Sequence, residues 1–287
     1  MRGGIMGDYK IIADSSCELP VQYKDDQRFE LVPFRLEIDG VPLRDTSDIN
    51  TKSLLEKIVD SKTFTNSACP SPDVFYNCIA KGEEKRIYII TISAKLSGCY
   101  LSAMIAKKLY EDAHGDKEIY VIDSKSISGA ESQLALLAMD LEEQGLPMDE
   151  IRKRLIRCRD DMRTYIVMSD LEAVYKYIKL DKIKDIVGKA GNIKSVLIRD
   201  KSEDPSDEVS RFCLKESFSQ MADSIAATLK DASEQTRVFI THCNNLIDAE
   251  KLRDLIMEKT GLKNIVIMSA SGFNSLLADN GGLIVSF

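Results

Sequence analysis

Short apolar runs alternate with longer amphipathic stretches in the first half of the chain. Apolar runs bounded by turn-forming residues are typical of buried strands, and they occur here at residues 9–13, 29–38, 85–92 and 119–122. Pro33 predicts an edge position for the second of these strands. Residues 97–110 and 134–144 carry apolar side chains at helical spacing and predict two amphipathic helices.

The second half repeats this alternation. Strands are predicted at residues 165–168, 193–198, 237–241 and 264–268, and helices at residues 212–229 and 246–258. Strands that alternate with helices of this length predict βαβ units and a parallel sheet, so the fold class is α/β. Residues 149–163 are rich in Arg and Lys and are interpreted as a solvated connecting helix. We therefore predict two domains, at residues 1–160 and 161–287.

Composition narrows the class of protein. The chain has 287 residues, which suits about two domains of ~150 residues each. With 39 basic and 46 acidic residues its net charge is −7, which disfavours nucleic acid or an anionic membrane as the main partner. No signal-peptide core opens the sequence, and no apolar run approaches the ~20 residues of a membrane span. We expect a soluble cytoplasmic protein with no integral membrane segment.

The seven cysteines form no C-x-x-C pair, which excludes a zinc ribbon or a thioredoxin-type site. We expect reduced thiols that serve as small apolar fillers. The aspartates at 14 and 123 have no adjacent carboxylate or histidine, so no metal site is predicted. Only two histidines are present. His114 lies in a turn-like segment, whereas His242 follows a predicted strand and either faces a site or is structural.

Polar clusters follow the predicted strands, at residues 14–16, 66–72, 91–98 and 123–126. Ligands of α/β proteins gather at the carboxyl ends of strands, where unpaired amides at helix N-termini attract anions. Helix capping explains any one such cluster, and four on one rim also fit a ligand site, so both interpretations stay open. The chain has no G-x-S-x-G elbow and no phosphate-binding glycine loop. Such a cleft suits holding an anionic ligand rather than transforming it.

Several segments, in order along the chain, match known motifs. Residues 14–20 read D-S-S-C-E-L-P, residues 67–72 read S-A-C-P-S-P, residues 93–100 read S-A-K-L-S-G-C-Y, residues 121–124 read V-I-D-S, and residues 192–194 read N-I-K. They resemble the segments D-S-[ST]-x-D-L-P, T-S-Q-P-S-P, S-S-x-L-S-G-T-Y, V-x-D-S and N-I-K of the DegV family, bacterial proteins that bind fatty acids.

The resemblance implies a parallel-sheet N-terminal domain and a second α/β domain, with a long-chain fatty acid in the cleft between them. It implies that Ser67 and Ser97 hold the carboxylate, supported by Ser93 and the Gly98 amide. Lys179 stands where the family has the arginine of G-G-R-I, and we expect it to bind ligand as well. Some members are carrier subunits that present the fatty acid to a separate ATP-binding subunit of a fatty acid kinase.

Our leading hypothesis is a non-catalytic fatty-acid-binding protein without cofactor or metal. In the family's H-x-G-P-G segment this chain has Ala278 in place of the histidine. One alternative is an enzyme that acts on a small phosphorylated or carbonyl ligand through His242, as related folds in dihydroxyacetone kinases do. Another is a paralogue that uses the fold for regulation or protein interaction.

Overall fold

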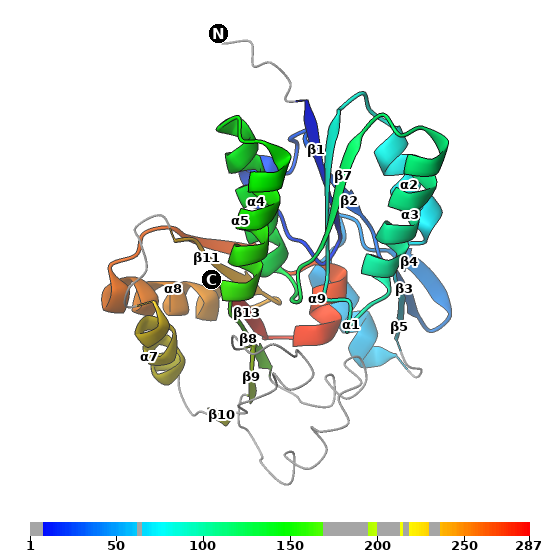
Figure 1. Ribbon diagram of the computed structural model, residues 1–287. Coiled ribbons are helices and arrows are strands. Elements are labelled where there is room, and N and C mark those ends of the chain that lie inside the picture. The colour runs from blue at the N-terminus through cyan, green and yellow to red at the C-terminus, as the bar shows by residue number, and fades with distance from the viewer. Residues whose placement is uncertain (1–7, 62–64, 169–194, 200–212, 215–217, 230–235) are drawn as a thin grey trace. The chain divides into compact units, whose positions relative to one another are not determined.

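The computed structural model describes residues 8–61, 65–168, 195–199, 213–214, 218–229 and 236–287 (Figure 1). The chain forms two compact units. Unit 1 comprises residues 1–48 and 61–161, and unit 2 comprises residues 49–60 and 162–287. The predicted split into domains after residue 160 remains a prediction, and these units differ from it chiefly in the segment 49–60.

The segment 49–60 contains helix α1 (Thr51–Asp60), which packs on helix α9 (Gly272–Ala278). The Thr51 hydroxyl donates a 3.1 Å hydrogen bond to the carbonyl of Ala270. Leu54 and Leu55 of α1 are buried. The contact of α1 with α9 and the bond from Thr51 to Ala270 explain why α1 belongs to unit 2, which no local pattern in the sequence indicated.

Unit 1 contains a parallel sheet of four strands in the order β2-β1-β6-β7. The strands are β1 (Tyr9–Asp14), β2 (Phe29–Val32), β6 (Arg86–Thr91) and β7 (Glu118–Asp123). Central strands β1 and β6 are almost wholly buried, as continuous apolar runs in parallel sheets require. A single 3₁₀ turn, η1 (Val21–Tyr23), follows β1.

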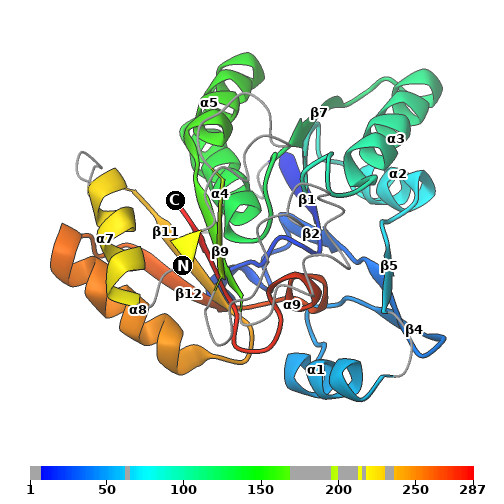
Figure 2. The ribbon, with the colours of Figure 1, turned by 90° about the horizontal axis from the view of Figure 1, so that it is seen from below.

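Helices cover both faces of this sheet (Figure 2). Helices α2 (Pro72–Ala80) and α3 (Cys99–Ala113) pack together on one side, and α4 (Gly129–Glu143) and α5 (Met148–Asp161) on the other. The segment interpreted as a connecting helix is α5, and it packs on α4 and buries Ile151 and Leu155. The arrangement is the α/β architecture that the sequence predicts.

The predicted single strand over residues 29–38 was wrong, because two strands in different sheets replace it. Strand β2 ends at Val32 on the edge of the parallel sheet, and β3 (Arg35–Ile38) joins a small antiparallel sheet with β4 (Val41–Arg44) and β5 (Asn66–Ala68). Pro33 lies at the break, where its missing N–H ends strand pairing. A tight turn with positive φ at Asp39 and Gly40 connects β3 to β4.

Unit 2 contains a mixed sheet of six strands in the order β10-β9-β8-β13-β11-β12. The strands are β8 (Thr164–Met168), β9 (Ser195–Arg199), β10 (Cys213–Leu214), β11 (Val238–His242), β12 (Ile265–Ser269) and β13 (Leu283–Ser286). Only β11 and β12 pair in parallel, because β13 lies antiparallel between β8 and β11. The predicted helix over 212–229 also starts later than expected, since residues 213–214 form β10.

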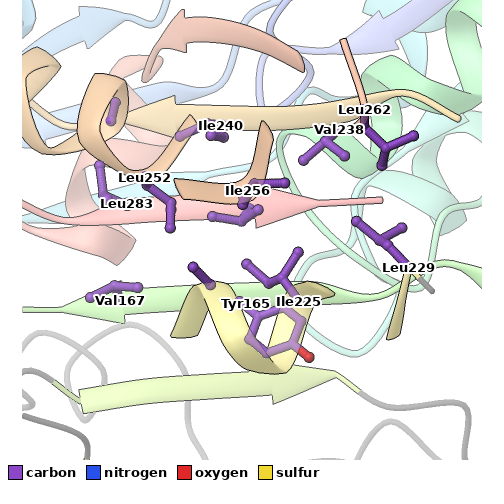
Figure 3. Packing of buried hydrophobic residues seen from close by; sticks show 13 residues of the cluster. Tyr165, Val167, Ile225, Leu229, Val238, Ile240, Leu252, Ile256, Leu262 and Leu283 are labelled. Atoms are coloured by element: carbon purple, nitrogen blue, oxygen red, sulfur yellow. The ribbon is translucent and has the colours of Figure 1, made fainter. Parts of the chain in front are cut away.

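Helices α7 (Phe218–Thr228) and α8 (Leu246–Thr260) pack together, and α8 also contacts strands of the unit 2 sheet. Their apolar faces and the sheet share one buried cluster (Figure 3). In it, Ile225 of α7 and Ile256 of α8 lie with Ile240 of β11 and Leu283 of β13. The core of unit 2 therefore depends on its last strand as much as on its helices.

Candidate ligand-binding site at the carboxyl end of the unit 1 sheet

The loops that follow β1, β6 and β7 are hydrogen-bonded to one another at the carboxyl edge of the parallel sheet. The carboxylate of Asp14 accepts a 2.8 Å bond from the amide of Ile92. The amide of Ser93 donates a 2.8 Å bond to the carbonyl of Ser126. Three of the four polar clusters singled out in the sequence therefore lie together.

The fourth cluster, residues 66–72, reaches the start of α3. Gly98 is the N-cap of α3, and a Cβ built on it would lie 3.1 Å from Sγ of Cys69. The Cys69 thiol also forms hydrogen bonds with the thiol of Cys99, the hydroxyl of Ser102 and the amide of Gly98. Glycine at 98 is what allows this close approach.

The predicted carboxylate ligands Ser67 and Ser97 lie on these two neighbouring segments. Ser67 is exposed on β5, where it pairs with Leu36 of β3. Ser97 is half-buried, and its hydroxyl donates a 3.4 Å bond to Sγ of Cys99 and accepts one of 3.4 Å from the Cys99 amide. Gly98 is exposed. The structure thus brings the two segments together, and the role of each residue stays a prediction.

Ser93, the third serine predicted to contact the ligand, has a structural role in the loop. The side chain of Ser93 is buried, and its hydroxyl accepts a 3.3 Å bond from the amide of Lys95. Ser93 therefore shapes the loop before α3. Lys179 and the segment 192–194 lie outside the described residues.

The first turn of α3 offers donors to an anion. The helix has 15 residues and a glycine N-cap without a capping side chain, and the Ser97 hydroxyl next to it accepts the bond from the Cys99 amide. The amides at the start of a helix and the positive end of the helix dipole together attract a carboxylate or another anion. No acidic residue lies in this first turn to oppose such a ligand.

Two fully buried carboxyl groups lie behind these loops. Burial raises the pKa of Asp14 to about 7, against the lowering effect of hydrogen bonds from the amides of Ile92 and Ser16. Burial also raises the pKa of Glu131 on α4 well above its usual range, and the neighbouring charge of Asp14 adds to it. Reasoning from the sequence placed Asp14 in a polar cluster and weighed it as a metal ligand, but it missed Glu131, whose burial depends on how α4 packs.

The histidine of the enzyme alternative has a structural partner. His242 ends β11 and is half-buried, and its Nδ1 accepts a 3.3 Å bond from the amide of Asn245. Burial lowers the pKa of its imidazole. His114 is exposed at the end of α3, with Nε2 3.0 Å from the hydroxyl of Tyr76.

Two kinds of feature were not found in the part of the chain that the structure describes. No group of three His, Cys, Asp or Glu residues there is placed to hold a metal ion. Of the helices described, none has the length and apolar character needed to span a bilayer.

Comparison with known proteins agrees with the motif resemblance. The sequence model of the family described as "Uncharacterised protein, DegV family" matches residues 8–279. A DegV domain-containing protein from Streptococcus gordonii is 29% identical over 284 residues, covering 97% of this chain and 98% of that protein.

Two solved structures share the whole fold. A DegV-family protein from Ruminococcus gnavus, solved with vaccenic acid, is 30% identical with a TM-score of 0.84, over 98% of this chain and 99% of that one. The fatty acid kinase (Fak) B3 protein of Streptococcus pneumoniae, loaded with linoleic acid, is 26% identical with a TM-score of 0.81, over 97% and 98%. The predicted α/β fold class is confirmed, and this chain belongs to the DegV family.

Proposed function

We propose that this protein binds a long-chain fatty acid without transforming it, and holds the carboxylate at the start of α3. The observation that carries the proposal is the approach of Cys69 to Gly98, which brings residues 66–69 against the N-terminus of α3. In this proposal the Ser67 and Ser97 hydroxyls donate to the carboxylate, the Gly98 amide, which also bonds the Cys69 thiol, supports them, and Lys179 adds positive charge. The fatty acids bound by the relatives from R. gnavus and S. pneumoniae support this ligand class.

Most of the affinity comes from the acyl chain. Burying about fourteen methylenes at roughly 0.8 kcal/mol each contributes at most about 11 kcal/mol. Association opposes this by at least about 4 kcal/mol. Each hydrogen bond to the charged head group adds about 1.5–3 kcal/mol before desolvation. The serine hydroxyls therefore mainly fix which end of the ligand lies at α3.

We also propose that the protein acts as a carrier in the cytoplasm. In our proposal, the protein presents the bound carboxylate to a separate ATP-binding subunit of a fatty acid kinase, and itself needs no metal or cofactor. The similarity to the Fak B3 protein of S. pneumoniae supports this partner. The engagement of His242 Nδ1 by the Asn245 amide gives the enzyme alternative no support.

Mass spectrometry of the ligand released from purified, denatured protein tests the binding function. We expect a co-purified fatty acid of C14–C18 in about equimolar amount. The delipidated protein should rebind that acid and bind the matching n-alkane much more weakly. Reproducible absence of any fatty acid, together with no rebinding of C14–C18 acids, contradicts the proposal.

A further inference from the structure

Two cysteines of unit 1 lie against each other beside the proposed head-group site. Cys69 follows β5 and is half-buried, whereas Cys99 is the first residue of α3 and is fully buried. The thiols are hydrogen-bonded to each other, and Gly98 lets the Cys69 sulfur approach the α3 backbone. These cysteines occupy the positions of Gln and Thr in the family segments T-S-Q-P-S-P and S-S-x-L-S-G-T-Y.

The surroundings of the two sulfurs make them chemically unequal. Hydrogen bonds from the Cys99 thiol, the Ser102 hydroxyl and the Gly98 amide lower the pKa of Cys69 to about 6. Burial raises the pKa of Cys99, and the hydrogen bond to Cys69 and the charge of Asp14 raise it further. At neutral pH, Cys69 is a thiolate within reach of solvent, and Cys99 is a protonated thiol behind it.

We propose that Cys69 and Cys99 are a peroxide-sensitive pair that closes to a disulfide, with Cys69 as the attacking sulfur and Cys99 as the resolving sulfur. The Cys69 thiolate attacks one oxygen of hydrogen peroxide, the O–O bond breaks, and hydroxide leaves and takes up a proton to become water. Cys69 is then a sulfenic acid.

The sulfur of Cys99 next attacks Sγ of Cys69. The S–S bond forms as the S–O bond breaks, and the departing hydroxide leaves as a second water with the proton of Cys99. Two thiols lose two electrons in total, and one peroxide is reduced to two waters. The reaction requires no cofactor and no bound fatty acid, so it does not depend on the proposed function.

The other buried thiols with shifted pKa values are poor competitors. Burial raises the pKa of Cys78 to about 12, helped by the charge of Glu30, and burial raises the pKa of Cys17 well above its usual range. A protonated, buried thiol reacts slowly with peroxide, because the thiolate is the nucleophile. Cys158 is half-buried like Cys69 and provides a matched control position.

Peptide mapping of the full-length, reduced and delipidated protein tests the proposal. After treatment with equimolar hydrogen peroxide and alkylation of the remaining thiols, we expect one dominant disulfide, between the peptides that contain Cys69 and Cys99. The Cys158→Ser variant should give the same link. The Cys99→Ser variant should stop at a Cys69 sulfenic acid that dimedone traps.

Alkylation kinetics give an independent readout that does not need the disulfide. Iodoacetamide should label Cys69 at pH 7 about two- to threefold faster than a free cysteine of ordinary pKa near 8.5, because the larger thiolate fraction is partly offset by the lower nucleophilicity of a low-pKa thiolate. The rate should be half-maximal near pH 6. The proposal is overturned if peroxide links Cys69 elsewhere or leaves it reduced while Cys158 oxidises. Slow labelling of Cys69 with an inflection above pH 8 would also overturn it.

Discussion

The hydroxyl of Ser15 donates a 2.7 Å hydrogen bond to Oδ2 of Asp45, and both residues are buried. The hydroxyl oxygen of Ser15 also accepts a 3.0 Å bond from the amide of Phe34, just before β3. Ser15 thereby ties the end of β1 to the small sheet whose strand β5 carries Ser67. Ser15 is buried, so its role is to hold this part of the site in position and not to contact the ligand.

Replacing Ser15 with alanine leaves the buried carboxylate of Asp45 without this donor. We expect Ser15→Ala to lower the free energy of unfolding by about 1–3 kcal/mol, since a buried polar group that loses its partner carries a desolvation penalty. Urea denaturation followed by circular dichroism measures the change. Ser47→Ala, at an exposed serine, is the control and should change stability by less than about 0.5 kcal/mol. Equal effects of the two substitutions would contradict the role given to Ser15.

Glu142 of α4 is a second buried link, at the other end of the sheet. Its Oε1 accepts a 2.6 Å bond from the Tyr88 hydroxyl, and its Oε2 lies 2.7 Å from Nη2 of Arg86. We expect Glu142→Ala to lower the free energy of unfolding by about 2–4 kcal/mol, because two partly or fully buried partners lose their acceptor.

Glu143 offers the matched control for this prediction. It also pairs with an arginine, Arg28, at 2.6 Å, but its side chain is 53% exposed. Glu143→Ala should therefore change stability by at most about 1 kcal/mol. If Glu142→Ala lowers the free energy of unfolding no more than Glu143→Ala does, burial of the Glu142–Arg86 pair contributes nothing to stability.

The raised pKa of Asp14 makes stability depend on pH. The folded pKa is about 7 and the unfolded value is 3.8, so between these values the folded state binds more protons than the unfolded state. The contribution of Asp14 is therefore fully present below pH 3.8 and is lost as pH rises through 7. Glu131 acts in the same direction, because burial raises its pKa as well.

Asp14→Asn isolates this effect. Asparagine resembles the protonated acid, so the variant should gain stability relative to the wild type as pH rises from 4 to 8, by about 1–4 kcal/mol. Urea titrations of both proteins at several pH values measure the difference. A constant difference across this range would show that Asp14 ionises normally in the folded state.

Ser97→Ala should weaken fatty-acid binding about tenfold to a hundredfold, the loss expected for one hydrogen bond to a charged head group. Calorimetric titration of delipidated protein with the co-purified acid measures it, and Ser47→Ala should bind like the wild type. Because the acyl chain supplies most affinity, binding should weaken without being abolished. An unchanged dissociation constant would remove Ser97 from the site.

Elements with a strong local signal were predictable from the sequence. The apolar runs of β1, β6 and β7 and the helical spacing of α3 predicted these elements to within three residues of their observed ends. Helix α4 was predicted too, but it begins at Gly129, five residues before the predicted start. Three of the polar clusters were found for the same reason, since polar residues that follow buried strands mark the carboxyl edge of a parallel sheet. The fourth, residues 66–72, begins with β5 of the antiparallel sheet.

What depends on distant contacts was not predictable. Strand β13 has only four residues, and its place between β8 and β11 is set by pairing with segments far along the chain. Cys69 and Cys99 were interpreted as fillers because nothing local shows that β5 ends beside α3. Both cysteines stand in motifs that the family resemblance assigns to the same carboxylate site. That shared assignment was the signal that could have shown that the two cysteines are neighbours.

Unit 2 is built from two separate segments of the chain, residues 49–60 and 162–287, and this limits the order in which it can fold during translation. Helix α1 is synthesised early, yet the carbonyl that Thr51 bonds to belongs to a residue 219 positions later. During translation, α1 is therefore made long before α9, the helix on which it packs. A nascent chain that stops before residue 272, or a fragment that ends at residue 161, would lack the helix on which α1 packs.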